Sequence, residues 1–289
     1  MKKNDCMTNR HFYQPIGVFD SGIGGLTVAN AILKHLPNEE IIYFGDTAHM
    51  PYGEKSADAI RYYCLRIVKF LLEKNCKIIV IACNSAASAA YRILLDFFEK
   101  EVLFVNVVDP LVERVNTEGY KIVGVIATKA TVKTGVYEQK LKELNPDLEV
   151  VSLATPLLAP MIEEGFFHDK ISHSVIENYL SYPDFDGIEA MLLACTHYPL
   201  IKPDIEAFFE NKVKVFDSTD VVAENVRKLL EIHQLLNDKR RHNHRFFVSD
   251  YTESFERTTK IFFPEEIKLE RMAIWTEGMW TCQVSNSCY

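Results

Sequence analysis

The sequence predicts an α/β fold made of two pseudo-symmetric, doubly wound domains with parallel sheets, and an active site in the cleft between them. The first observation is that short apolar runs alternate with helical patterns along most of the 289 residues. The second is an internal repeat, because residues 16–21 resemble residues 123–128. The third is that each half later carries an apolar run that ends in Ala-Cys, at residues 82–83 and 194–195.

The apolar runs give the expected strands in order. A continuous apolar run bounded by polar residues is typical of a strand buried on both faces of a parallel sheet. The expected strands are residues 16–19, 41–44, 78–82, 103–107, 122–126, 149–153, 190–194 and 213–216. The helical patterns between them are residues 25–36, 57–74, 86–100, 134–144, 169–180 and 220–236. After residue 245 a new apolar run indicates a return to the first domain.

The repeat predicts how the chain divides into domains. The second domain is expected at residues 109–213, inserted between the two parts of the first domain, residues 1–108 and 214–289. Ligands of open α/β sheets bind beyond the carboxyl ends of the strands, which is where both Ala-Cys segments fall. A cleft between the domains is therefore the expected binding site.

Composition and charge exclude several classes of function. A net charge of −8 and a pI of about 5.6 argue against nucleic acid as the main partner. No run approaches the roughly 18 apolar residues of a membrane span, and the first residues lack the apolar core of a signal peptide. The seven cysteines show no metal-ligand spacing, so we expect reduced thiols in a cytoplasmic protein and no metal site.

The two Ala-Cys segments hold the strongest candidates for chemistry. A thiol acts as a base only when a charged or dipolar neighbour makes its thiolate accessible. His197 could serve Cys195 in this way, and Asp20 could serve Cys83 if the first and third strands are adjacent. One Ala-Cys segment is usually an inert buried thiol, but two in matched contexts favour a functional pair.

Two further loops complete the candidate site. Asp20 and Ser21 precede three glycines that open a helix. The spacing of these glycines matches that of phosphate loops poorly, and the Asp20 carboxylate would repel a phosphate. Asp20 is better suited to attract an ammonium group or to exchange a proton, and a plain helix cap is an evenly matched alternative. The rigid turn at residues 51–53 offers backbone donors to a carboxylate.

Taken in order, these motifs resemble the cofactor-independent aspartate/glutamate racemase superfamily. The resemblance covers residues 16 to about 250, and its motifs are residues 20–28, 45–47, 51–53, 82–84 and 195–199, with further landmarks at 124–131, 156–165 and 217–218. Ser85 stands where the family usually has threonine, and Thr155 stands where a cysteine is frequent. The ending at 277–289 is atypical, and Cys282 and Cys288 receive no role.

The resemblance implies interconversion of L- and D-glutamate without a cofactor, and in bacteria D-glutamate enters peptidoglycan. It implies that Cys83 deprotonates D-glutamate and Cys195 deprotonates L-glutamate, from opposite faces of Cα. Asp20 and His197 would assist their respective thiols. The implied substrate-binding residues are Asp20, Ser21, Tyr52, Gly53, Asn84, Ser85, Thr196 and His197. Whether the chain forms a homodimer is left open.

Three other functions compete with this interpretation. A racemase of the same fold could act on aspartate or another amino acid, although residues 20–22 and 51–53 favour glutamate. A thiol redox protein could use Cys83 and Cys195 as a dithiol, which predicts a reversible disulfide. A binding module that inherited the fold is the third alternative, and the intact pair of thiols weighs against it.

Overall fold

The structure is a computed structural model that describes residues 11–251 and 253–275. The strands are β1 (Ile16–Asp20), β2 (Ile41–Gly45), β3 (Ile78–Ile81), β4 (Leu103–Asn106), β5 (Ile122–Ala127), β6 (Glu149–Ala154), β7 (Ala190–Ala194), β8 (Lys214–Phe216), β9 (Arg245–Val248) and β10 (Leu269–Arg271). The α-helices are α1 (Leu26–His35), α2 (Ala57–Glu73), α3 (Asn84–Phe98), α4 (Asp109–Asn116), α5 (Lys129–Thr134), α6 (Val136–Leu144), α7 (Leu158–Glu163), α8 (Lys170–Leu180), α9 (Lys202–Phe208), α10 (Thr219–Ile232) and α11 (Glu253–Phe262). The short 3-10 turns are η1 (Tyr52–Glu54), η2 (Pro183–Phe185) and η3 (Tyr198–Ile201).

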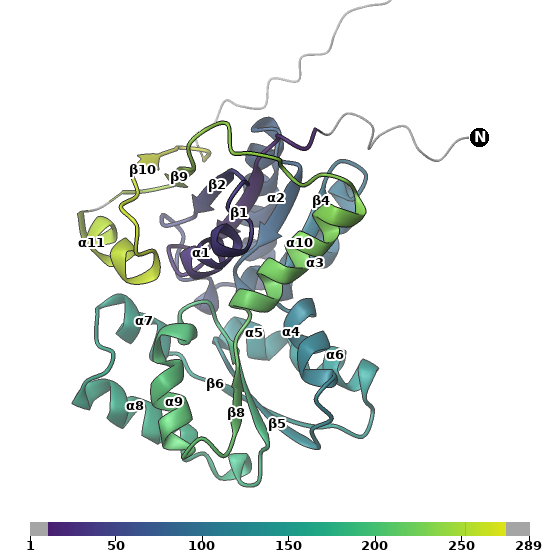
Figure 1. Ribbon diagram of the computed structural model, residues 1–289. Helices are drawn as coiled ribbons and strands as arrows, with labels where there is room; N and C mark the ends of the chain where they lie inside the picture. The colour runs from purple at the N-terminus through teal and green to yellow at the C-terminus, as the bar shows by residue number, and fades with distance from the viewer. Residues whose placement is uncertain (1–10, 252, 276–289) are drawn as a thin grey trace, which may run out of the picture.

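The described residues form two parallel sheets, one above the other in Figure 1. The larger sheet has the strand order β10-β9-β2-β1-β3-β4, and the smaller one has the order β6-β5-β7-β8. Helices cover both faces of each sheet. In the larger sheet α1 packs with α10 on one face and α2 with α3 on the other, while α4 with α6 and α8 with α9 flank the smaller sheet. The predicted α/β class with doubly wound parallel sheets is confirmed.

The two sheets repeat one topology. Strands β2-β1-β3-β4 of the larger sheet and β6-β5-β7-β8 of the smaller sheet follow the same order. The register is also the same, because Phe19 pairs with Ile81 in one sheet as Ile126 pairs with Leu193 in the other. In both sheets the order reverses next to the first strand of the set, between β1 and β3 and between β5 and β7. That reversal leaves a ligand crevice at the carboxyl ends of these strands.

The chain enters the second sheet after β4 and leaves it after β8. The sequence analysis placed residues 214–216 in the first domain, but β8 pairs in parallel with β7, so this placement of the strand is wrong. The strand has three residues. Its apolar run is too short to be distinguished from the connection that follows. Strand β9 pairs with β2, so the chain does return to the first sheet after residue 245.

Two expected helices have different limits in the structure. The helix expected at 134–144 begins at Val136 as α6, and α5 before it was not among the expected helices. Gly135 separates the two helices with a φ of 65°, which lies in the left-handed region that glycine adopts without strain. The helix expected at 220–236 ends at Ile232, and Gln234 beyond it has a φ of 56°. Within the described ranges, every helix is too short or too polar to cross a membrane.

Candidate active site

Cys83 lies at the carboxyl end of β3, where it caps the N-terminus of α3. Its Sγ accepts a hydrogen bond from the backbone N–H of Ala86 at 3.4 Å and donates to Ser21 Oγ at 3.7 Å. The side chain is 4 % exposed, and burial together with the charge of Asp20 raises the pKa of the thiol well above its usual range. Both effects favour the protonated form of the Cys83 thiol.

Asp20 ends β1, the strand beside β3. Its Oδ2 accepts hydrogen bonds from the backbone N–H groups of Gly22 at 3.1 Å and Gly25 at 3.0 Å, so the expected capping role is present. Burial raises the pKa of this carboxyl, and the charge of His197 opposes the rise. Oδ1 is buried and has no hydrogen-bond partner among the described residues. One oxygen holds the glycine turn, and the other is left for a ligand.

Cys195 follows β7, at the position in the second sheet that Cys83 occupies in the first. Its Sγ lies 3.6 Å from His197 Nδ1, and His197 Nε2 lies 2.8 Å from Glu163 Oε1. Burial lowers the pKa of His197, but the hydrogen bonds to Cys195 and Glu163 outweigh it and raise that pKa well above its usual range. His197 therefore stands where it can exchange a proton with the Cys195 sulfur.

Glu163 is a site residue that the sequence analysis did not assign. It ends α7, and it contacts His197 only because α7 packs against the η3 turn. Its position among the family landmarks at 156–165 was the one available signal.

Asn84 and Ser85, which open α3, reach across to the second domain. Asn84 Oδ1 accepts a hydrogen bond from the Tyr137 hydroxyl at 2.6 Å, while its Nδ2 is buried with no partner in the described part of the chain. Ser85 Oγ lies 2.9 Å from Thr128 Oγ1. Burial raises the pKa of the Tyr137 hydroxyl, and Asp109 and Cys195 are near enough to add to this rise. These contacts join the surroundings of the two cysteines.

Gly24 of the first domain packs against the loop of the second domain that follows Cys195. A Cβ placed on Gly24 would lie 2.4 Å from His197 Cε1 and 2.7 Å from Thr196 Oγ1, so the Gly24 backbone is in direct contact with these side chains. Thr27 Oγ1 also donates to the backbone carbonyl of Thr196 at 3.1 Å. The ring of Phe262, from α11, packs edge-on against His197 at 5.1 Å.

The turn at Tyr52 and Gly53 meets Thr128, the residue of the second domain that Ser85 also contacts. The Tyr52 hydroxyl donates to Asp46 Oδ2 at 2.6 Å, so this hydroxyl is engaged within the protein. Because the first residues of a helical turn have unpaired N–H groups, the loop offers its backbone to an anion. A Cβ on Gly53 would lie 2.8 Å from Thr128 Cβ, which places the loop against the second domain.

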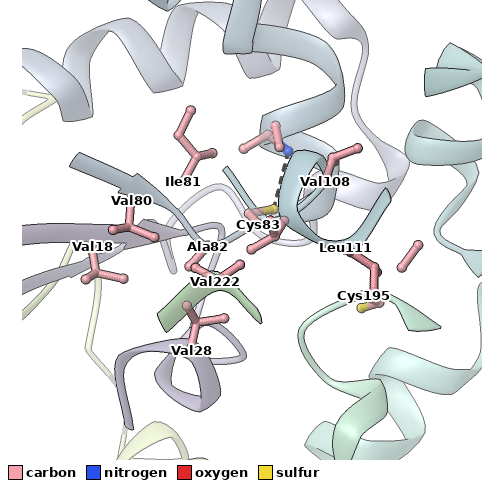
Figure 2. Packing of buried hydrophobic residues seen from close by; sticks show 14 of the residues in the cluster. Val18, Val28, Val80, Ile81, Ala82, Cys83, Val108, Leu111, Cys195 and Val222 are labelled. Carbon is pink, nitrogen blue, oxygen red and sulfur yellow. Dashed lines mark hydrogen bonds between the residues drawn. The ribbon is translucent and has the colours of Figure 1, made fainter. Parts of the chain in front are cut away.

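Figure 2 shows the two cysteines on separate ribbon segments, one from each domain. The structure therefore brings together Asp20, Ser21, Cys83, Asn84 and Ser85 from the first domain with Cys195, Thr196 and His197 from the second. A cavity of about 780 Å³ lies elsewhere, between α2, α3 and residues 272–274, and contains none of these residues. In the ranges that the structure describes, no group of three or more His, Cys, Asp or Glu side chains is arranged to hold a metal ion.

The close contact at Gly24 gives a first prediction. In Gly24→Ala the new methyl group must displace His197, which breaks its alignment with Cys195. If the site is catalytic, we expect its turnover to fall about 100-fold, the usual cost of a 1 Å misplacement, while the fold is retained. Steady-state kinetics with thermal denaturation tests this. Gly22→Ala is the control, because its Cβ would meet Met50 Sδ at an ordinary 3.4 Å. Equal activity of the two variants would contradict the prediction.

Comparison with known proteins agrees with this geometry. Residues 24–226 match the family described as Asp/Glu/Hydantoin racemase. The glutamate racemase of Geobacter metallireducens is 39 % identical over 254 residues, which cover 86 % of this chain and 93 % of that protein. The glutamate racemase of Streptococcus pneumoniae is 36 % identical over 263 residues, 90 % of this chain and 99 % of that protein.

Solved structures of glutamate racemases are also similar to this chain. The glutamate racemase of Francisella tularensis in complex with D-glutamate has a TM-score of 0.85 and 38 % identity, covering 91 % of this chain and 98 % of that one. The glutamate racemase of Thermus thermophilus in complex with beta-chloro-D-alanine has a TM-score of 0.83, 37 % identity and the same coverage. The aspartate racemase of Picrophilus torridus, at 21 % identity and a TM-score of 0.55, shares the fold alone. On its sequence and its fold, the chain belongs to the Asp/Glu/Hydantoin racemase family.

Proposed function

We propose that this chain interconverts L-glutamate and D-glutamate, with Cys83 and Cys195 exchanging protons with opposite faces of Cα. The observation that carries the proposal is a pair of buried, unpartnered polar atoms beside Cys83, the acceptor Asp20 Oδ1 and the donor Asn84 Nδ2. Buried polar atoms of native proteins are nearly always hydrogen-bonded, so each exception needs an explanation. An amino acid offers both complements, because its ammonium group donates and its carboxylate accepts.

The names of the relatives support glutamate as the substrate. The relatives at 36–39 % identity are glutamate racemases, and one structural neighbour holds D-glutamate. The aspartate racemase from Picrophilus torridus is far more distant in both sequence and structure. Aspartate as the preferred substrate is therefore the weaker alternative.

The neighbours of the two thiols suit a reaction that starts from L-glutamate, because His197 lies 3.6 Å from the Cys195 sulfur and can hold its proton. With that proton on His197, Cys195 removes the Cα proton from one face. Cys83 delivers its own proton to the other face of the carbanion and becomes the thiolate. The product is D-glutamate, and the same steps in reverse convert D-glutamate to L-glutamate. One thiolate and one thiol are required at each start.

The other predicted residues are assigned to binding in this proposal. Asp20 Oδ1 receives the ammonium group, and Asn84 Nδ2 with Thr196 holds the α-carboxylate. Ser21, Ser85 and the backbone of Tyr52 and Gly53 complete the set. The proposal needs no cofactor for the proton transfers. It further places the reaction in the cytoplasm, where D-glutamate is supplied for peptidoglycan, with a homodimer as the assembly to test.

The direct experiment is a racemisation assay on purified protein. With L- or D-glutamate alone and no added cofactor, we expect circular dichroism to decay to zero as the equimolar mixture forms. We expect L-aspartate to react at least about tenfold more slowly, because one methylene is worth that much discrimination. Activity that disappears on dialysis against a chelator and returns with pyridoxal phosphate or a metal would contradict the proposal.

A further inference from the structure

The carboxylate of Asp46 is fully buried beyond the end of β2 and accepts hydrogen bonds from three side chains. Its Oδ2 receives the Tyr52 hydroxyl at 2.6 Å, its Oδ1 receives the Ser249 hydroxyl at 2.7 Å, and His49 Nδ1 lies 2.9 and 3.0 Å from the two oxygens. Burying a carboxylate is costly unless donors satisfy it. Here two donors come from the loop that follows Asp46, and the third comes from Ser249, the residue after β9.

These hydrogen bonds fold residues 46–54 into a fixed loop. Tyr52 begins the η1 turn at the far end of the loop, so its bond to Asp46 joins the two ends directly. Ser249 follows β9, and its Oγ also accepts the backbone N–H of Ala48 at 2.9 Å. Asp250 N donates to Thr47 Oγ1 at 2.9 Å. The loop is therefore held by side chains that bind one carboxylate. Hydrogen bonds also join it to the two residues that follow β9.

The loop lies between the two halves of the site. At its start the backbone N–H of Asp46 donates to the carbonyl of Asp20 at 3.0 Å. At its end Gly53 touches Thr128 of the second domain, and Glu54 lies 3.3 Å from Lys129 Nζ. A displacement of the loop thus moves the backbone that faces a ligand in the cleft, while both cysteines are held by other elements.

We propose that Asp46 is a positioning residue for substrate binding: its carboxylate fixes the loop so that the backbone of Tyr52 and Gly53 can hold a carboxylate of the substrate. This inference rests on the proposed function, because it concerns the grip on glutamate. The Tyr52 hydroxyl serves Asp46 in this arrangement. Because the loop binds the substrate in the ground state and in the transition state alike, its loss raises KM more than it lowers kcat.

The test compares Tyr52→Phe, Asp46→Asn and a matched control, Leu230→Ala. Tyr52→Phe keeps the ring and removes one donor. Asp46→Asn keeps the shape but turns an amide N–H₂ toward other donors. Leu230 is fully buried in α10, which packs on α1, so its truncation lowers stability without touching the loop. Kinetics in both directions and thermal denaturation are measured for all three variants.

We expect KM for glutamate to rise at least about tenfold in Tyr52→Phe and further in Asp46→Asn, the effect of losing hydrogen bonds to a charged group. We expect kcat to change less, and Leu230→Ala to keep the wild-type KM. The double variant should resemble Asp46→Asn alone, since the two residues act through one bond. An unchanged KM in Tyr52→Phe, or an equal rise in Leu230→Ala, overturns the proposal.

Amide hydrogen exchange separates this inference from the proposed function. If Asp46 fixes the loop, the amides of residues 48–54 exchange faster in Tyr52→Phe and Asp46→Asn than in the wild type, and Leu230→Ala leaves their exchange unchanged. A wild-type protein that does not racemise glutamate refutes the proposed function, whatever the loop does. Unchanged exchange in both loop variants refutes the role of Asp46 in fixing the loop, whatever the wild-type activity is.

Discussion

Cys83→Ser and Cys195→Ser are each expected to lose racemisation in both directions by about 100-fold or more, the contribution of a positioned acid or base. A serine hydroxyl is a far weaker base than a thiolate, and it is also a poor acid toward a carbanion. In the proposed mechanism each turnover uses both thiols, so the loss of one stops the reaction from either enantiomer. The racemisation rate is followed by circular dichroism.

Exchange of the Cα proton with deuterated water separates the two thiols. Because each enantiomer presents its Cα proton to one thiol, we expect each variant to retain exchange with one enantiomer and to lose it with the other. NMR measures this for L- and D-glutamate. Cys76→Ala is the matched control, because Cys76 is a buried thiol just before β3 and Cys83 follows the same strand. Near wild-type racemisation in either serine variant would show that the two-thiol mechanism is wrong.

Lys77→Met is expected to lower the free energy of unfolding by about 3–5 kcal/mol, the cost of breaking a buried ion pair. Lys77 Nζ lies 2.6 Å from Glu39 Oε2, with both side chains almost completely buried, and it donates to the Leu235 carbonyl at 2.8 Å. Burial lowers the pKa of Lys77 and raises the pKa of Glu39, and their mutual attraction opposes both changes. Without the lysine, the carboxylate is left buried and unpaired.

Chemical denaturation of three variants measures this effect. Glu270→Gln is the control, because its ion pair with Arg245 is about 40 % exposed and such pairs contribute about 0–1 kcal/mol. Replacing both partners, as Lys77→Met with Glu39→Leu, should recover most of the loss, since no buried charge remains. Lys77 precedes β3 at the end away from Cys83, so kcat at low temperature should stay at the wild-type value. A loss no larger than that of Glu270→Gln would refute the prediction.

The eight strands up to residue 216 could be predicted from sequence to within one residue at each end, because a strand covered on both faces needs a continuous apolar run. The strand at Ile78–Ile81 is an example. No bounds were predicted for β9 and β10. The helix expected at 134–144 was started two residues too early, because a glycine near the start of a helical pattern is compatible with a position inside or before the helix. The placement of β8 failed because a three-residue strand carries too little pattern to show which sheet it joins.

The candidate site was predictable where it depends on strand ends. Asp20, Cys83 and Cys195 follow directly from the topology, because the carboxyl ends of parallel strands meet at one edge of a sheet. Glu163 depends on how α7 packs against a distant turn, and no local pattern records that packing. The hydrogen bond from the Tyr52 hydroxyl to Asp46 could not be predicted, because the conformation of the turn decides where the ring points.

The contacts that join the two domains are made by the residues that surround the thiols. Ser85 meets Thr128, Asn84 meets Tyr137, and Gly24 meets His197. In the proposed mechanism, these contacts set the separation between the acid and the base, because each cysteine is held by its own domain. A substitution that shifts one domain against the other is therefore expected to slow racemisation even when both thiols are intact.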